Sequence, residues 1–235
     1  MTAVRQARSE SPWKIGVFAF LAFAVMASAL SLPLLIRAYL FQPFNIPASS
    51  MMPTLEVGDY LFVAKYAYTG ILGGQPARGD VIVFLLKDNS TPYIKRVVGL
   101  PGDRIQMKSG VLYINGAAVM RERLPDFAGE GACGSGSRGG AKRWRETLPN
   151  GVSYETLDCI DNGLYDNTNV YAVPDGHLFM LGDNRDNSTD SRVQSAVGYV
   201  PTKNVIGRAG MIFLSVGGSR GGPGIRFGRI GTLVR

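Results

Sequence analysis

An uncharged apolar segment near the beginning of the chain limits its possible folds more than any other feature. The segment IGVFAFLAFAVMASALSLPLLI covers residues 15–36. As a helix rising 1.5 Å per residue, a segment of this length crosses a hydrocarbon core of roughly 30 Å. Three cations lie in residues 1–14, whereas Arg37 is the one cation between the segment and Lys65. Because cytoplasmic flanks carry the excess of Lys and Arg, we expect the N-terminus in the cytoplasm and the chain after residue 37 on the far side.

The same segment has a competing interpretation as a cleaved signal peptide. Residues 27–29 read ASA, which is typical of an A-x-A cleavage site. The apolar run continues through LSLPLLI, however, beyond the usual signal core of roughly 7 to 15 residues. We therefore predict an uncleaved anchor, and a single span, because no second apolar run of this length follows in the sequence.

The composition of the whole chain favours a folded, turn-rich protein. Apolar residues make up 46% of the 235 residues and charged residues 18%, which excludes a disordered chain. Thirty glycines and thirteen prolines favour β structure with loops. The formal charge of +7 could suit anionic lipid or nucleic acid. Since the cations form no dense stripe, we expect contact with membrane lipid and no nucleic-acid partner.

Short apolar runs separated by turn residues predict the strands of a mainly β fold. The predicted strands lie within residues 59–68, 80–86, 93–99, 111–120, 177–184 and 205–216. Asn115-Gly116 between two apolar runs predicts a type I′ hairpin. The proline-broken residues 39–50 predict an extended lead-in.

The composition changes between the predicted strands at about residue 121. Residues 121–170 are rich in glycine and basic residues, and their GSGSRG sequence lacks the flanking strand and helix that a nucleotide-binding motif requires. The sequence therefore predicts four parts: a cytoplasmic N-terminus (1–14), an anchor (15–36), a β domain (37–120 and 171–235) and an inserted peripheral lobe (121–170).

The usual catalytic and metal-binding side chains are scarce. His177 is the one histidine, and its place beside an Asp-Gly turn favours a strand-edge residue over a member of a Ser-His-Asp triad. Cys133 and Cys159 lack the spacing of a zinc site, and either a disulfide or two free thiols fits the sequence. Residues 186–197 lack the glycine and glutamate of a calcium loop. We expect no metal or nucleotide cofactor.

A lysine can replace histidine as the base that activates a serine, provided that its amine is neutral. Burial lowers the pKa of lysine from about 10.4 and so makes the neutral form accessible. Lys95 lies in the apolar run YIKRVVG, where Tyr93, Lys95 and Val97 share one face of a strand. The alternative is an edge-strand lysine that prevents aggregation.

Three motifs in fixed order carry a resemblance to a known family. PASSMMPTL (47–55), YIKRVVGLPGD (93–103) and GDNRDNSTDSR (182–192) together resemble the conserved boxes of bacterial type I signal peptidase, the membrane-bound leader peptidase. The resemblance covers residues 43–103 and 172–215. It implies a signal-peptidase-like antiparallel β-sheet catalytic domain on the extracytoplasmic face of the cytoplasmic membrane. It also implies a monomeric serine endopeptidase that removes A-x-A signal peptides from exported preproteins.

The resemblance assigns roles by position in these motifs. Ser50 aligns with the nucleophile, Lys95 with the general base, and Ser188 with a serine that hydrogen-bonds the lysine. A supporting polar network would comprise Asp183, Arg185, Asp190 and Arg192. The pocket for the substrate's small side chains would be lined by Phe44, Ile46, Leu55, Tyr93 and Ile94.

One position departs from the family pattern. The family's oxyanion hole combines the backbone N–H of the nucleophile with a hydroxyl two residues earlier, where this chain has Ala48. Losing one such donor costs about 10²-fold or more in rate. Ser49, a water molecule or the backbone alone could serve instead. Two other functions fit the sequence: a dedicated pilin- or conjugation-processing peptidase of the same chemistry, and a non-catalytic membrane-tethered β module.

Overall fold

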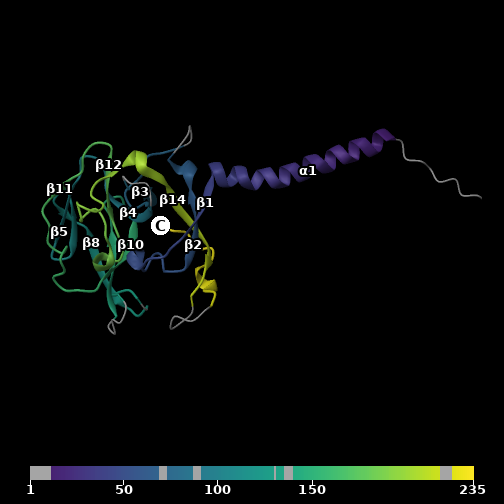
Figure 1. The fold of residues 1–235 in the computed structure, drawn as a ribbon. Helices are drawn as coiled ribbons and strands as arrows, with labels where there is room; N and C mark the ends of the chain where they lie inside the picture. Colours follow the sequence, from purple (N-terminus) through teal and green to yellow (C-terminus); the bar gives the residue numbers. More distant parts are fainter. Residues whose placement is uncertain (1–11, 69–72, 87–90, 130, 135–139, 218–223) are drawn as a thin grey trace, which may run out of the picture. The chain divides into compact units, whose positions relative to one another are not determined.

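The computed structural model describes residues 12–68, 73–86, 91–129, 131–134, 140–217 and 224–235 (Figure 1). The chain divides into two compact units, Met1–Leu40 and Phe41–Arg235. This division neither confirms nor contradicts the separate lobe at residues 121–170, which stays a prediction.

The first unit contains one helix, α1 (Pro12–Tyr39), which includes the whole apolar segment. Large apolar side chains along it, such as Phe18, Phe20 and Phe23, are exposed. Among the helices that the structure describes, none is long and apolar enough to cross a membrane. The fold therefore does not confirm the anchor predicted for residues 15–36.

The second unit is mainly antiparallel β structure, as predicted. Its largest sheet has the strand order β1-β2-β14-β3-β4-β12-β13, and each neighbouring pair is antiparallel. The strands are β1 (Phe41–Asn45), β2 (Asp59–Ala64), β3 (Val81–Leu85), β4 (Pro92–Gly99), β12 (His177–Leu181), β13 (Val200–Pro201) and β14 (Val205–Ser215). The strand predicted over 59–68 is shorter than expected, because η2 (Lys65–Ala67), a 3-10 turn, follows Ala64.

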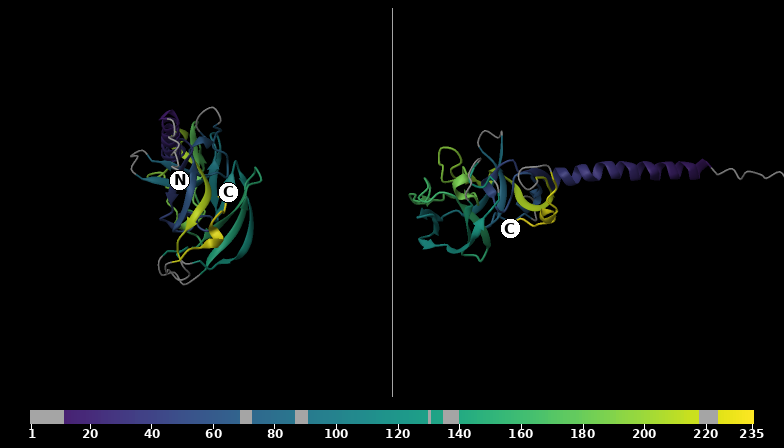
Figure 2. Two further views of the ribbon diagram at one scale, coloured as in Figure 1. Left: turned by 90° about the vertical axis from the view of Figure 1, so that its right-hand side faces the viewer. Right: turned by 90° about the horizontal axis from the view of Figure 1, so that it is seen from below.

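Two smaller antiparallel sheets complete this unit, and Figure 2 shows the sheets from two further sides. One has the order β10-β9-β8, and the other has the order β11-β5-β6-β7. Their strands are β5 (Arg104–Lys108), β6 (Val111–Ile114), β7 (Ala117–Ala118), β8 (Met120–Phe127), β9 (Ala141–Thr147), β10 (Ser153–Asp158) and β11 (Tyr171–Ala172). Asn115 and Gly116 join β6 to β7 with φ values of 53° and 84°, which confirms the predicted hairpin. Four further 3-10 turns are η1 (Ser49–Met51), η3 (Arg185–Asn187), η4 (Thr202–Asn204) and η6 (Phe227–Arg229).

Strands β3 and β4 are buried on both faces, because their alternate side chains enter different hydrophobic clusters. Val81 and Val83 pack in one cluster with Met51. Ile82 and Val97 belong to another cluster. A polar side chain on β4 therefore lies in the interior and needs a partner there.

Candidate active site

The turn that carries Ser50 is held at both ends by buried apolar side chains. Ile46 lies before it, and Met51 and Leu55 lie within and after it, all in one cluster. The backbone N–H of Leu55 donates to the Met51 carbonyl at 2.9 Å. Ser50 itself is only partly buried. The motif therefore fixes the backbone of η1 while leaving the serine accessible.

Lys95 on β4 brings its amine to the Ser50 hydroxyl. The distance from Lys95 Nζ to Ser50 Oγ is 2.8 Å, and Nζ also donates to the Ile94 carbonyl at 2.9 Å. Lys95 is 4% exposed. Burial lowers the pKa of Lys95 to about 8, although the charges of Asp190 and Asp183 act in the opposite direction. A substantial share of the amine is therefore neutral near pH 8, as a base requires.

The edge-strand interpretation of Lys95 is wrong. Strand β4 lies between β3 and β12, and Lys95 is opposite Ile82 of β3. An aggregation-preventing lysine would need an unpaired strand edge.

His177 begins β12, and its Nδ1 is 2.8 Å from the Asp175 carbonyl oxygen, next to the predicted turn.

Gly182 lets the Ser50 turn approach the segment that carries Ser188. A Cβ atom at Gly182 would lie 2.6 Å from the Ser50 carbonyl oxygen and closer still to the Ser188 hydroxyl. The Gly182 N–H donates to Asp190 at 3.0 Å, so this backbone cannot move away freely. The position therefore excludes any side chain while the turn keeps its place.

We predict that Gly182→Ala lowers kcat by about 10²-fold, because it would displace Ser50, the predicted nucleophile, and a displacement on the order of 1 Å at a reacting atom has an effect of that size. The matched control is Gly228→Ala, since a Cβ there meets no atom within 4 Å. Steady-state kinetics on one peptide substrate would compare the two variants. Wild-type kcat in a folded Gly182→Ala enzyme would contradict the prediction.

Asp190 forms the centre of one buried polar group. Both its oxygens accept from Arg192, at 2.9 Å each, and Oδ2 accepts from the Ser188 hydroxyl at 2.8 Å. Burial alone would raise the pKa of Asp190, but Arg192 outweighs it and the pKa is lowered. Asp190 is therefore a fixed negative charge near Lys95.

The Ser188 hydroxyl donates to Asp190 Oδ2 at 2.8 Å. Asp190 accepts this hydrogen bond because a carboxylate is a strong acceptor and lies only two residues away. The oxygen of Ser188 can still accept, so its hydrogen bond with the lysine stays a prediction.

Asp183 pairs with Arg96, a residue that the sequence reasoning missed. Arg96 Nε and Nη2 donate to the two Asp183 oxygens at 2.7 and 2.6 Å, and both side chains are buried. The Thr54 hydroxyl donates to the same carboxylate at 2.5 Å. Removing one partner of such a pair leaves a buried charge and costs about 3–5 kcal/mol. The signal for Arg96 was its place beside Lys95 in an apolar strand.

Arg185 pairs with Glu146, which the sequence reasoning also missed. Arg185 Nη1 and Nη2 donate to the Glu146 carboxylate at 2.9 and 2.5 Å, and the Tyr154 hydroxyl donates to it at 2.9 Å. Arg192 Nη2 donates to the Arg185 carbonyl at 2.5 Å. Hydrogen bonds thus join Arg185, Arg192 and Asp190, whereas Asp183 pairs separately with Arg96.

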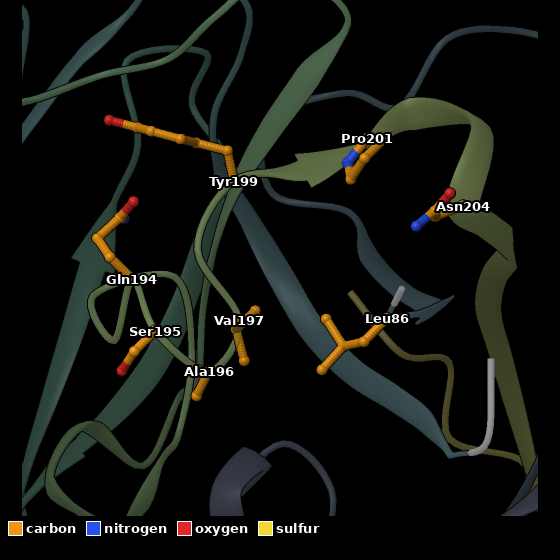
Figure 3. Close-up of a pocket in the computed structure, with 8 residues that line it drawn as sticks. All are labelled: Leu86, Gln194, Ser195, Ala196, Val197, Tyr199, Pro201 and Asn204. Carbon is orange, nitrogen blue, oxygen red and sulfur yellow. The ribbon is translucent and has the colours of Figure 1, made fainter. Parts of the chain in front are cut away.

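Four of the five predicted pocket residues lie together. Ile46, Leu55, Phe44 and Ile94 belong to the cluster that contains Met51. Tyr93 belongs to a different cluster, with its ring centroid 6.0 Å from Lys95 Nζ. A cavity of about 330 Å³ is formed elsewhere, by Leu86 and parts of residues 194–204 (Figure 3), and it includes none of the five.

Cys133 and Cys159 form a disulfide, with their Cα atoms 5.5 Å apart. This resolves the choice that the sequence left open. The disulfide packs beside Met52, the residue directly after the η1 turn.

A serine hydroxyl beside a buried lysine amine, on an antiparallel sheet, is the arrangement of serine hydrolases that use lysine as the base. The sequence model of the family described as "Signal peptidase, peptidase S26" matches residues 16–214. The chain belongs to this family and is a serine endopeptidase.

Two signal peptidase I sequences from Rickettsia support this assignment. Signal peptidase I of Rickettsia typhi is 37% identical over 82% of this chain and 79% of the relative. Signal peptidase I of Rickettsia conorii is 38% identical over 80% of this chain and 77% of the relative. A solved signal peptidase I from Enterococcus faecalis has 27% identity and a TM-score of 0.33, covering 57% of this chain and 97% of its own.

Proposed function

We propose that this protein removes N-terminal signal peptides from exported preproteins, using Ser50 as the nucleophile and Lys95 as the general base. The observation that carries the proposal is the 2.8 Å contact between Ser50 Oγ and the amine of Lys95, a buried lysine of lowered pKa. The Ser50 hydroxyl needs a base to become nucleophilic, and the neutral amine of Lys95 is within hydrogen-bond distance of it.

The reaction proceeds in two halves. Ser50 Oγ attacks the scissile carbonyl carbon while Lys95 Nζ takes the hydroxyl proton. Lys95 then gives that proton to the leaving amine nitrogen as the C–N bond breaks, which leaves an ester on Ser50. A water molecule next attacks this ester while Lys95 takes its proton. Lys95 returns that proton to Ser50 Oγ as the C–O bond to the serine breaks, which releases the carboxylic acid and restores the free serine. The Ile94 carbonyl binds one N–H of the amine and thereby helps to direct its lone pair.

The oxyanion of each half is stabilised by the Ser50 backbone N–H in this proposal. Ala48 has no hydroxyl to add a second donor, and its backbone is extended. The Ser49 hydroxyl oxygen accepts a hydrogen bond from Asn187 Nδ2 at 2.7 Å. The backbone therefore carries more of the stabilisation than it would with a serine at position 48.

A membrane anchor fits this reaction, because signal peptides are themselves held in the membrane. The apolar residues 15–36 and the exposed apolar side chains of α1 support an anchor with its N-terminus in the cytoplasm. The disulfide supports a catalytic unit outside the cytosol, where thiols oxidise. We place the site on the extracytoplasmic face of the cytoplasmic membrane.

We infer that the −1 and −3 side chains of the substrate bind beside Phe44, Ile46, Leu55 and Ile94, which pack in one apolar cluster, and that this site admits alanine-like side chains. We predict cleavage after Ala-x-Ala and at least about 10²-fold slower cleavage when phenylalanine replaces the −1 alanine. Mass spectrometry of a purified preprotein's products would locate the cut, with a −2 substitution as control. Equal rates with alanine and phenylalanine at −1 would contradict the proposal.

A further inference from the structure

The segment 184–187 lies between the η1 turn, which carries Ser50, and the disulfide. Two asparagines of this segment connect the η1 turn to the residue before Cys133. Asn184 Nδ2 donates to the Ser49 carbonyl at 3.1 Å and to the Ala132 carbonyl at 2.6 Å. Asn187 Nδ2 donates to the Ser49 hydroxyl oxygen at 2.7 Å and to the same Ala132 carbonyl at 3.5 Å. Each amide thus uses one N–H on the residue before the nucleophile and the other on the residue before Cys133.

The orientation of Asn184 is fixed by its donors. Its side chain is fully buried, and its Oδ1 atom has no hydrogen-bond partner among the residues that the structure describes. Rotating the amide by 180° would place this oxygen against two carbonyl oxygens. The Asn184 backbone N–H also donates to the Ser50 carbonyl at 3.1 Å. A buried amide oxygen without a partner is unfavourable, so the structure keeps these donor contacts at a cost.

The other half of the disulfide is bound by the same segment. Asp186 Oδ2 accepts from the backbone N–H of Cys159 at 2.7 Å and from that of Ile160 at 2.9 Å. Both cysteines also pack in a cluster with Met52, two residues after the nucleophile. The disulfide therefore joins the two backbone positions that the 184–187 segment holds.

We propose that the Cys133–Cys159 disulfide positions the nucleophile, acting through Asn184 and Asn187, and that turnover depends on its being oxidised. This inference rests on the proposed role of Ser50. Without the S–S bond, the covalent link between the Ala132–Cys133 backbone and Cys159 is lost, and the Ala132 carbonyl, which accepts from both amides, is held less firmly. The asparagines then hold Ser49 and Ser50 less closely against Lys95.

The expected effect is on turnover and not on binding. Misplacing a reacting atom on the order of 1 Å can lower the rate by about 10²-fold, and a partial loss of this support should lower kcat by about 10-fold. The cluster of Ile46, Leu55 and Ile94 does not include the cysteines. The KM for a signal-peptide substrate should therefore change by no more than about twofold.

The test compares the full chain in three forms: oxidised, treated with dithiothreitol, and as the double variant Cys133→Ala/Cys159→Ala. Dithiothreitol supplies two electrons and two protons to the S–S bond, giving two thiols and its own cyclic disulfide. We expect the reduced and double-variant forms to share the lower kcat, with dithiothreitol having no effect on the double variant. Equal kcat in all three forms would overturn the proposal.

Two further variants separate positioning from general stability. Asn187→Leu keeps a similar volume but removes both donors, so it should lower kcat to a similar degree even with the disulfide intact. Val119→Ala opens a cavity in a different cluster and should lower the melting temperature without changing kcat. Loss of kcat in Val119→Ala equal to that in the reduced enzyme would also overturn the proposal. If Ser50→Ala stayed active, the proposed function would fail first; if only the redox and Asn187 effects were missing, this inference alone would fail.

Discussion

Ser50→Ala is expected to lower kcat for preprotein cleavage by about 10⁴-fold or more, since loss of a catalytic nucleophile has effects of that order. The substitution removes one oxygen atom from a partly buried side chain, so the enzyme should remain folded. Cleavage would be followed by electrophoresis of a purified preprotein, with circular dichroism to verify the fold. Normal cleavage by the folded variant would remove Ser50 from the mechanism.

Ser49→Ala is the matched control for this experiment, because the two serines are adjacent on the same 3-10 turn. Ser49 Oγ accepts a hydrogen bond from Asn187, whereas Ser50 Oγ is the hydroxyl in contact with Lys95. We expect Ser49→Ala to lower kcat by about 10-fold or less, because it removes one of several contacts that hold the turn. An inactive Ser49→Ala beside an active Ser50→Ala would reverse the assignment.

The strands, the hairpin turn and the buried lysine could be anticipated because their signals are local. Alternating apolar residues predict strands, Asn115-Gly116 predicts the hairpin turn, and a lysine within an apolar strand predicts a lowered pKa. The pairing of Ser50 with Lys95 came from the motifs and their order. The 2.8 Å contact between the two residues agrees with that expectation.

The partners of the polar network could not be anticipated in the same way. Arg96 meets Asp183 across 87 residues of sequence, and Arg185 meets Glu146 across 39 residues. Nothing in the local pattern around Glu146 distinguishes it from other charged residues on a strand. Such contacts depend on how sheets pack, which one sequence does not reveal. The disulfide could not be anticipated either, because the sequence fits both a disulfide and two free thiols at Cys133 and Cys159.

The catalytic rate should depend on pH through the protonation of Lys95. Lys95 must be neutral to accept the serine proton, and its pKa is about 8 because burial disfavours the charged amine. Below that pH the amine is protonated, so kcat/KM should fall about tenfold for each pH unit, to about one hundredth of its plateau at pH 6. Above pH 8 the neutral form dominates and the rate should level off.

Lys95→Arg tests whether neutrality of the amine, and not merely positive charge, is what the site requires. A guanidinium stays protonated in proteins, so it can fill the same place and still accept no proton. We expect kcat to fall by about 10²- to 10⁴-fold, the usual contribution of a general base. Initial rates between pH 5.5 and 9.5 on wild type and variant would show both effects. A flat wild-type profile, or an active arginine variant, would mean that a group other than Lys95 takes the proton. Lys95 predicts the opposite, because its amine contacts Ser50 Oγ and becomes neutral near pH 8.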